Sequence, residues 1–168
     1  DNVLAKQAGC GRTPWHFDDH HFPLDTNDVV TAWAPAQPIP LEMGPLSFAY
    51  PLDVHKLVNA VTFKKTGTGY DRGVSDVFSK NNVSVNETPF ELGEVSFHHN
   101  LNFHTASSNR TNRSRVALAN TYYRDGARVV NSPTMVSGDW QKFMPNVKPG
   151  DVAASPLNPI CWPVKDKS

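Results

Sequence analysis

A histidine and an aspartate two positions apart, His16 and Asp18, are the residues of this chain best placed to do chemistry. In an extended strand, residues i and i+2 project from the same face, so both side chains can reach one metal ion. A second histidine would complete a set of two imidazoles and one carboxylate on one side of the ion. Such a set leaves the opposite coordination positions open, as non-haem Fe(II) oxygenases require. By residue type, His98, His99 and His104 are the candidates for the second histidine.

A second chemical signal is Arg115, which begins a stretch, 115–122, with the alternation of a strand. One face of that strand would carry Arg115, Ala117, Ala119 and Thr121, so it is small apart from one guanidinium group. Such a face leaves space beside a fixed positive charge, which a carboxylate ligand could fill by a bidentate pair of hydrogen bonds. The alternative is that Arg115 lies on the surface of an edge strand.

The elements that must position these residues are short. Prolines (14) and glycines (10) are spread through the 168 residues, which disfavours long helices and favours strands joined by turns. We expect a turn at 98–100, because His98, His99 and Asn100 separate two apolar stretches. The patterns predict further strands at 28–36, 46–50, 94–97 and 101–104, and short helices at 53–60, 74–80 and 138–144.

One domain is expected over residues 1–168, because a chain of this length can bury a single core. Residues 64–92 have a different, more polar character and predict an insertion, either a substrate lid or an ordinary polar loop. The proline-rich residues 145–168 predict an extended tail that packs on the domain through three apolar side chains, Leu157, Ile160 and Trp162.

Charge and composition exclude several classes of partner. The 16 basic and 16 acidic side chains balance, so no electrostatic footprint for nucleic acid or an anionic membrane is present. No apolar run reaches the roughly 18 residues needed to span a bilayer. Residues 1–9 lack a hydrophobic signal core, which predicts a cytoplasmic protein, and Cys10 and Cys161 are expected to be free thiols.

The metal motif belongs to a series of sequence blocks that occur in a fixed order. They are 13–18 with 23–25, Trp33, the turn at 42–46, the block 93–99 with His104, Asn109 and Arg115, and the closing segments 148–151 and 155–159. In content, order and spacing these blocks resemble the phytanoyl-CoA dioxygenase family. The resemblance covers most of the chain and is weakest over the predicted lid.

The resemblance implies a mainly β fold, a double-stranded β-helix or jelly-roll barrel of the cupin type. It also implies an Fe(II)- and 2-oxoglutarate-dependent oxygenase. Carried onto this chain, His16, Asp18 and His104 would be the iron ligands. Arg115, eleven residues beyond His104, would hold the far carboxylate of 2-oxoglutarate, and Trp33 would lie at the same cosubstrate site.

The expected reaction uses dioxygen to hydroxylate a C–H bond of a small organic or acyl substrate. Halogenating relatives carry a small residue in place of the carboxylate, so Asp18 argues for hydroxylation. Two other classes stay open: a Zn(II) site of the hydrolase type, and a non-catalytic jelly-roll binding module. An intact set of ligands with Arg115 argues against both.

The chain departs from the family in two respects. His20 and His21 stand where the family carries aromatic residues, and they could line the substrate pocket, support the metal ligands or lie in solvent. The metal motif also begins after only 15 residues, whereas relatives have a long segment before it. The resemblance therefore predicts the C-terminal part of a longer protein, with some barrel strands missing and sheet edges exposed.

Overall fold

A computed structural model describes residues 1–62, 68–131 and 139–162 of the chain. The chain divides into two compact units. The first unit comprises residues 1–17 and 30–121, and the second comprises residues 18–29 and 122–168. No helix among the described residues has the length and apolar character that a bilayer span requires.

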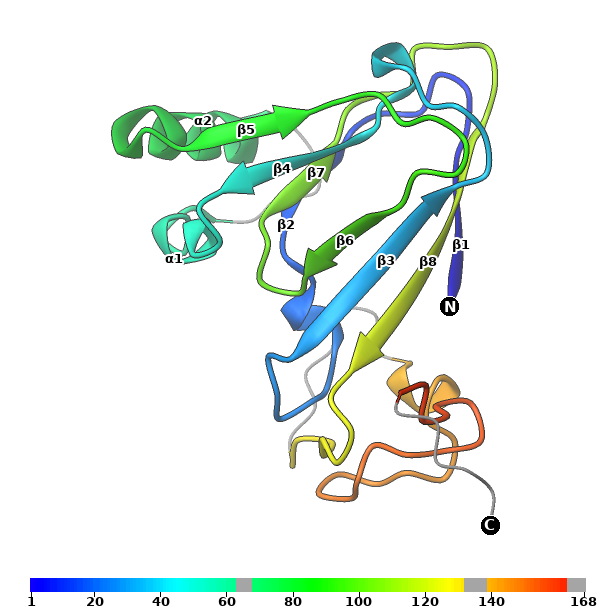
Figure 1. Cartoon of the computed structure of the whole chain (residues 1–168). Coiled ribbons are helices and arrows are strands. Elements are labelled where there is room, and N and C mark those ends of the chain that lie inside the picture. The colour runs from blue at the N-terminus through cyan, green and yellow to red at the C-terminus, as the bar shows by residue number, and fades with distance from the viewer. Residues whose placement is uncertain (63–67, 132–138, 163–168) are drawn as a thin grey trace. The chain divides into compact units, whose positions relative to one another are not determined.

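Eight strands of the described chain form two four-stranded antiparallel sheets (Figure 1). The first sheet has the order β1-β8-β3-β6, formed by Asn2–Lys6, Arg115–Tyr123, Val29–Pro35 and Ser96–His99. The second sheet has the order β2-β7-β4-β5, formed by Thr13–His16, His104–Ala106, Leu46–Tyr50 and Ser84–Glu87. Two sheets and eight strands are the pattern of a jelly roll, so the predicted fold class is confirmed.

The predicted strand boundaries hold in some places and shift in others. The strands predicted at 46–50 and 115–122 match β4 and β8. The turn predicted at 98–100 is wrong, because His98 pairs with Thr31 and so extends β6 along β3. This ladder overrides the local polar pattern, and the turn follows at Asn100 and Leu101. The strands β1 and β5 were not predicted.

The core of the first unit lies between the two sheets. Trp33 of β3, Leu46 of β4, Ala106 of β7 and Ala117 of β8 belong to one buried cluster, which also contains Ile39, Met43 and Phe90. Ala119 packs against this cluster as well. The small-residue face expected for the strand at 115–122 therefore points inward, which leaves space inside the barrel.

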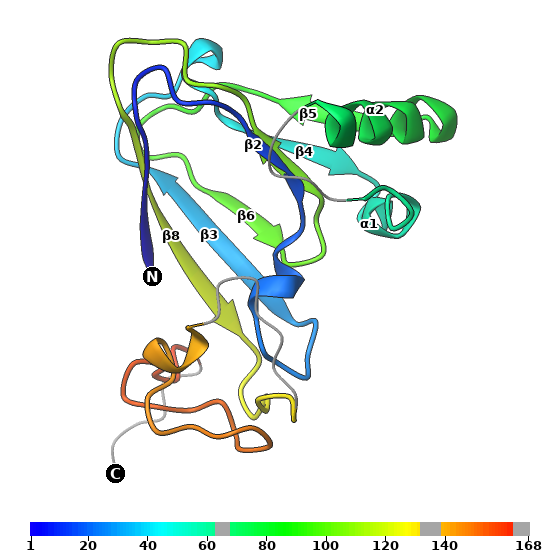
Figure 2. The ribbon, with the colours of Figure 1, turned by 180° about the vertical axis from the view of Figure 1, so that it is seen from behind.

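Two helices cover the outer face of the second sheet (Figure 2). Neighbouring residues of a strand face opposite ways, so Phe48 points into the barrel and Ala49 points outward. Ala49 packs with Val54 of α1 (Val54–Leu57) and Val74 of α2 (Gly69–Asn81) in a second buried cluster. Of the region predicted as a lid, α2 and β5 are described and residues 63–67 lie outside the described part; the lid role stays a prediction.

The second unit has its own buried cluster. It contains Leu24, Val29, Val129, Trp140, Met144, Val147 and Ala153. The helix predicted at 138–144 is a 3-10 turn, η3 (Trp140–Lys142), and residues 132–138 lie outside the described part. The proline-rich tail packs through Val147 and Ala153, whereas Leu157, Ile160 and Trp162 are exposed, so the predicted tail contacts are wrong.

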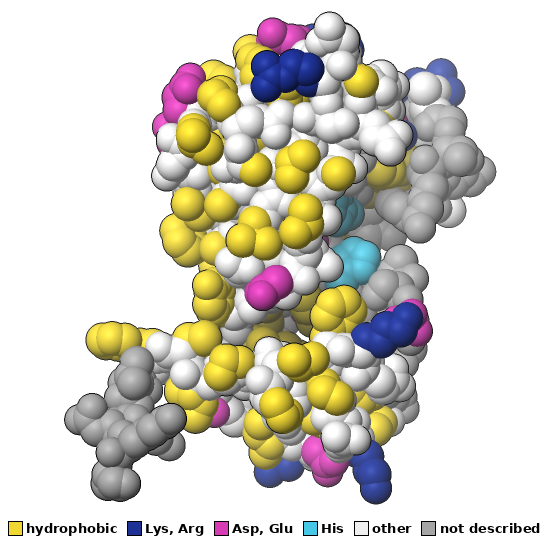
Figure 3. Space-filling model, turned by 90° about the vertical axis from the view of Figure 1, so that its right-hand side faces the viewer, with side chains coloured by type: hydrophobic (Ala, Val, Ile, Leu, Met, Phe, Trp, Pro, Cys, Tyr) yellow, Lys and Arg dark blue, Asp and Glu magenta, His cyan; other side chains and the backbone are white. Residues whose placement is uncertain are grey.

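The free edge of the first sheet carries exposed apolar side chains. Val3 of β1 is 73% exposed and lies opposite Leu118 of β8, which is 40% exposed. Figure 3 shows the corresponding side of the molecule, where hydrophobic side chains lie among polar ones. Cys10 and Cys161 are exposed free thiols, as predicted.

Candidate metal centre and cosubstrate site

His16 and His104 lie opposite each other on neighbouring strands of the second sheet. His16 ends β2, His104 begins β7, and the two residues are paired in the strand register. Their ring centroids are 4.2 Å apart. This pairing joins residues 88 positions apart in the sequence, which spacing alone could not establish.

The hydrogen bonds of both imidazoles select the same tautomer. The Nδ1 atom of His16 lies 2.8 Å from the carbonyl oxygen of Pro14, and that of His104 lies 2.9 Å from the carbonyl oxygen of Asn102. A carbonyl oxygen only accepts, so each Nδ1 must donate its proton. Nε2 then carries the lone pair in each ring. This arrangement, in which a backbone carbonyl orients the ring, is common for metal-ligating histidines.

Asp18 completes a group that could hold a metal ion. One ligand atom from each of His16, Asp18 and His104 lies within 4.8 Å of the others. Asp18 is not in the strand, because β2 ends at His16 and Asp18 begins the 3-10 helix η1 (Asp18–His21). The chain turn, rather than strand alternation, therefore brings the carboxylate to the imidazoles. Two neutral nitrogens and one carboxylate oxygen are a donor set suited to Fe(II).

The other histidines considered in the sequence analysis, His20, His21, His98 and His99, are not members of this metal group. His98 is buried on β6, and its ring centroid is 4.9 Å from that of His104. His99 supports the turn at Asn100 and Leu101, because its Nδ1 atom accepts a 3.1 Å hydrogen bond from the backbone N–H of Leu101. His20 and His21 lie in η1.

Arg115 is buried inside the first unit, so the surface alternative is wrong. Only 5% of the residue is exposed, and β8 is an inner strand between β1 and β3. One terminal nitrogen, Nη1, donates a 2.6 Å hydrogen bond to the carbonyl oxygen of Gly44. The guanidinium carbon lies 5.4 Å from the ring centroid of Trp33. Burial lowers the pKa of Arg115 from its ordinary value.

Two buried donors, one within this guanidinium group and one on the neighbouring Trp33 ring, have no hydrogen-bonding partner among the described residues. They are Nε of Arg115 and the indole Nε1 of Trp33. A buried donor without an acceptor costs roughly 1–3 kcal/mol, so a ligand that supplies acceptor atoms is expected there. A carboxylate suits both the charge and the donor groups.

Lys6 is a second buried cation that the sequence reasoning missed. It pairs with Arg115 in the register of β1 and β8 and is only 7% exposed. Its Nζ donates hydrogen bonds to the carbonyl oxygens of Ala106 (3.1 Å) and Ser107 (2.7 Å). Burial, and then the charge of Arg115, lower the pKa of Lys6 to about 8. A strand predicted at 2–6 and paired with 115–119 would have found it.

The cation pair and the metal group face the same interior. Ala106 lies two residues after His104 on β7, and Ala117 lies two residues after Arg115 on β8. Both alanines belong to the cluster between the sheets. Because residues i and i+2 share a face of a strand, His104 and Arg115 both point into the barrel.

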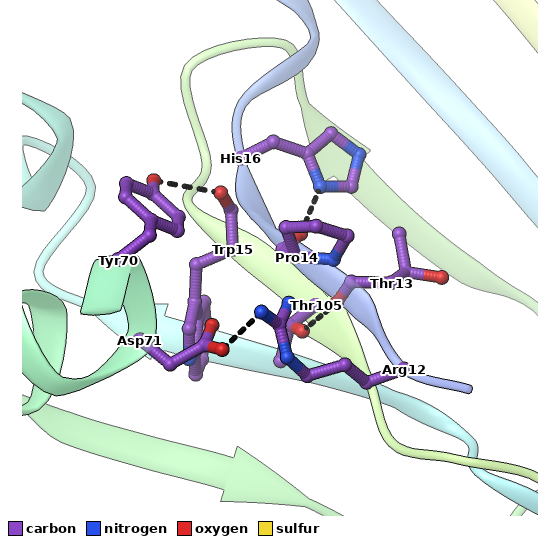
Figure 4. Close-up of polar contacts among 8 residues, drawn as sticks. All are labelled: Arg12, Thr13, Pro14, Trp15, His16, Tyr70, Asp71 and Thr105. Carbon is purple, nitrogen blue, oxygen red and sulfur yellow. Dashed lines mark hydrogen bonds and ion pairs between the residues drawn. The ribbon is translucent and has the colours of Figure 1, made fainter. Parts of the chain in front are cut away.

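The metal strand is held from outside by α2 (Figure 4). The Tyr70 hydroxyl donates a 2.8 Å hydrogen bond to the carbonyl oxygen of Trp15. Arg12 and Asp71 form an ion pair beside it, as Figure 4 shows. The Trp15 ring stacks on Phe103 with a centroid distance of 5.5 Å. Burial, and then the charge of Asp71, raise the pKa of Tyr70 to about 12, so the hydroxyl stays a donor at ordinary pH.

Comparison with known proteins decides the family. A sequence model described as phytanoyl-CoA dioxygenase (PhyH) matches residues 1–117. The chain belongs to the phytanoyl-CoA dioxygenase family. The predicted family is thereby confirmed; the closing blocks 148–151 and 155–159 lie outside the matched residues. A search of curated proteins finds no match.

Several solved structures share the fold of this chain. The non-haem α-ketoglutarate-dependent carbocyclase SnoK from nogalamycin biosynthesis is 23% identical, with a TM-score of 0.69. The epimerase SnoN, solved with Fe³⁺, α-ketoglutarate and nogalamycin RO, is 23% identical, with a TM-score of 0.68. The alignments cover 92% of this chain but 58% of SnoK and 60% of SnoN. The non-haem monooxygenase ThoJ, as its Ni complex, is 19% identical over 79% of this chain and 44% of ThoJ, with a TM-score of 0.54.

Proposed function

We propose that this chain carries the active centre of a non-haem Fe(II)- and 2-oxoglutarate-dependent oxygenase that hydroxylates a C–H bond of a small substrate. His16, Asp18 and His104 would hold the iron. Membership of the phytanoyl-CoA dioxygenase family supports this function. The observation that carries it is the buried Arg115 guanidinium, which has an unpartnered donor and faces the same interior as the metal group.

The cosubstrate assignment follows from the charges inside the barrel. Lys6 and Arg115 are both buried, and each makes its described hydrogen bonds to backbone carbonyl oxygens rather than to a carboxylate. A ligand with a carboxylate at one end would offset part of this positive charge and could accept from Arg115 Nε and Trp33 Nε1. 2-Oxoglutarate has such a carboxylate, and a keto acid at its other end that can bind a metal.

The iron, when bound with 2-oxoglutarate and dioxygen, would supply the oxidation of the C–H bond. The protein would hold the iron through Nε2 of two histidines and bind the far carboxylate through Arg115. It would also keep bulk water from the interior. Asp18 would be the third ligand. A carboxylate at this position supports hydroxylation rather than halogenation, because halogenating relatives carry a small residue there.

The test is an anaerobic calorimetric titration of the chain, first with Fe(II) and then with 2-oxoglutarate. We expect one iron site that is lost in Asp18→Ala, and cosubstrate binding that needs iron and weakens at least tenfold in Arg115→Met. Arg113→Met is the control, since Arg113 lies in the exposed loop before β8. Succinate release with a panel of small substrates then tests turnover.

Two results would contradict the proposal. Undiminished 2-oxoglutarate affinity in Arg115→Met would contradict the role of Arg115 in binding the cosubstrate. Tight Zn(II) binding without any response to 2-oxoglutarate would favour the hydrolase-type metal site instead.

A further inference from the structure

A cavity of about 360 Å³ opens between the two sheets of the first unit. One wall is formed by Leu46 and Phe48 of β4, and the facing wall by Ser96 and His98 of β6. Asn86 of β5 contributes to the first side. The volume is within the range of small-molecule sites, roughly 300–1,000 Å³.

The wall of this cavity touches a candidate metal ligand. The ring centroid of His98 is 4.9 Å from that of His104, and the centroid of Phe48 is 6.1 Å from it. Phe48 and His98 also contact each other, with centroids 5.3 Å apart. A molecule in the cavity would therefore lie beside the residues that surround the metal group.

The described lining combines apolar and hydrogen-bonding side chains and contains no carboxylate, ammonium or guanidinium group. Leu46, Phe48 and Tyr50 give an apolar side. Serine, threonine, asparagine and histidine side chains give the polar side, and among the described residues none of those that line the cavity is Asp, Glu, Lys or Arg. A second cavity of about 470 Å³ lies between α2 and the outer face of the second sheet. Its lining is charged, because it includes Arg12, Arg72, Asp71 and Glu87.

Two polar groups of the lining are oriented by the backbone. The backbone N–H of Leu101 donates to Nδ1 of His99, so the neutral ring carries its proton on Nε2 and presents a donor. The amide nitrogen of Asn102 donates to the carbonyl oxygen of Ala49 at 3.3 Å, which leaves the amide oxygen as an acceptor. A hydroxyl or carbonyl group of a ligand could use both kinds of partner.

We propose that this cavity is the substrate chamber, and that it takes an uncharged molecule with an apolar face and hydroxyl or carbonyl groups. The inference rests on the proposed function for its catalytic meaning. Phosphate groups of a coenzyme A thioester would need arginine or lysine partners, which the lining does not offer. We therefore expect a coenzyme A thioester to bind this chamber more weakly than an uncharged ligand.

The test uses probes that differ in charge but share one ring. Cyclohexanecarboxamide, cyclohexanecarboxylate, cyclohexylmethylamine and the coenzyme A thioester of cyclohexanecarboxylic acid are titrated into the metal-free chain with ¹³C-labelled leucine methyl groups. We expect the carboxamide to shift the methyl signals of Leu46 and Leu52, which line the cavity, and not that of the exposed Leu92. The three charged probes should bind at least tenfold more weakly.

Matched variants locate the binding. Thr88→Leu narrows this cavity at an exposed position and should weaken carboxamide binding at least fivefold. Ser75→Leu makes a similar change in the other cavity, also at an exposed position, and should leave binding unchanged. Equal or tighter binding of the thioester or the carboxylate at Leu46 and Leu52 would overturn the proposal, as would carboxamide shifts confined to other methyl groups.

A metal measurement separates this inference from the proposed function. Mn(II) bound at the His16, Asp18 and His104 group should broaden the proton signals of the carboxamide, and Asp18→Ala should abolish that broadening. Methyl shifts without any Mn(II) binding would support the ligand-binding cavity but contradict the proposed oxygenase function. Bound Mn(II) without broadening of a bound probe would place the cavity too far from the metal and overturn its role as substrate chamber.

Discussion

The hydroxyl group of Tyr70 donates a hydrogen bond to the carbonyl oxygen of Trp15, the residue that precedes the candidate ligand His16. The helix α2 is thereby tied to the metal strand β2, through a bond that lies on the outer face of the sheet (Figure 4). The position of His16 thus depends on a contact between two residues, Trp15 and Tyr70, that lie 55 positions apart in the sequence.

Tyr70→Phe should loosen the metal strand without touching the ligands. The loss of one hydrogen bond is expected to lower the free energy of unfolding by about 1 kcal/mol. Metal affinity should fall up to about tenfold, the lower end of the effect of groups that support ligands. Chemical denaturation and Fe(II) titration measure the two effects. Tyr122→Phe, at a position 42% exposed, is the control, and equal losses in both variants would contradict the role of Tyr70.

Gly44→Ala should disturb both the fold and Arg115. Gly44 has a φ of 73°, and a Cβ atom there would collide with the backbone carbonyl group of Ser107. Its own carbonyl oxygen accepts from Arg115. Gly9 has a similar φ of 70° but open space around it, so Gly9→Ala isolates the conformational cost, about 1–2 kcal/mol.

The difference between the two glycine variants is the measurement that matters. Gly44→Ala should lose clearly more unfolding free energy than Gly9→Ala in thermal or chemical denaturation, and it alone should weaken 2-oxoglutarate binding. Equal destabilisation would show that the Ser107 backbone moves aside at little cost.

Lys6 should give stability and cosubstrate binding opposite dependences on pH. Its pKa is about 8 in the folded chain and about 10.5 in the unfolded chain. Between pH 8 and pH 10 the unfolded state binds more protons at this group, so the free energy of unfolding gains a contribution that rises with pH. Over the same range the folded chain loses a positive charge beside Arg115, so 2-oxoglutarate affinity should fall.

Lys6→Met should flatten both trends relative to the unaltered chain, and Lys56→Met, at an exposed position, should flatten neither. Denaturation and calorimetric titration at pH 7, 8, 9 and 10 provide the comparison. The window ends at pH 10 because tyrosines of the unfolded chain begin to ionise there. A cosubstrate affinity that stays constant through pH 8 in the unaltered chain would remove Lys6 from the site.

Val3→Lys should reduce self-association of the chain. Val3 lies on the edge strand β1 opposite the exposed Leu118, and an apolar edge with free backbone groups is a template for pairing with another chain. Sedimentation velocity over a range of concentrations should show less association in Val3→Lys. Leu92→Lys, which places the same charge at a 67% exposed residue outside the strands, should have a smaller effect, and the reverse order would contradict the edge model.

From the sequence by itself, alternation and the spacing of prolines and glycines predicted short strands, and the resemblance of the motif blocks predicted the family and with it the jelly-roll fold. Both predictions were possible because these are local or linear properties. It also indicated the small face of the strand that begins at Arg115, since alternation in one strand needs no partner; that this face points inward came from the structure. The roles assigned to His16, Asp18, His104, Arg115 and Trp33 stay predictions, but their residue types could be chosen from the chain alone.

Only the tertiary structure decided which of these side chains meet. Strand pairing joins His16 to His104 and Lys6 to Arg115, and a 3-10 turn brings in Asp18. Another pairing, that of β3 with β6, places His98 in a strand of the barrel wall instead of the predicted turn. The physical reason is that ladder hydrogen bonds and burial act between segments about a hundred residues apart, and a buried cation such as Lys6 looks in the sequence like any surface lysine.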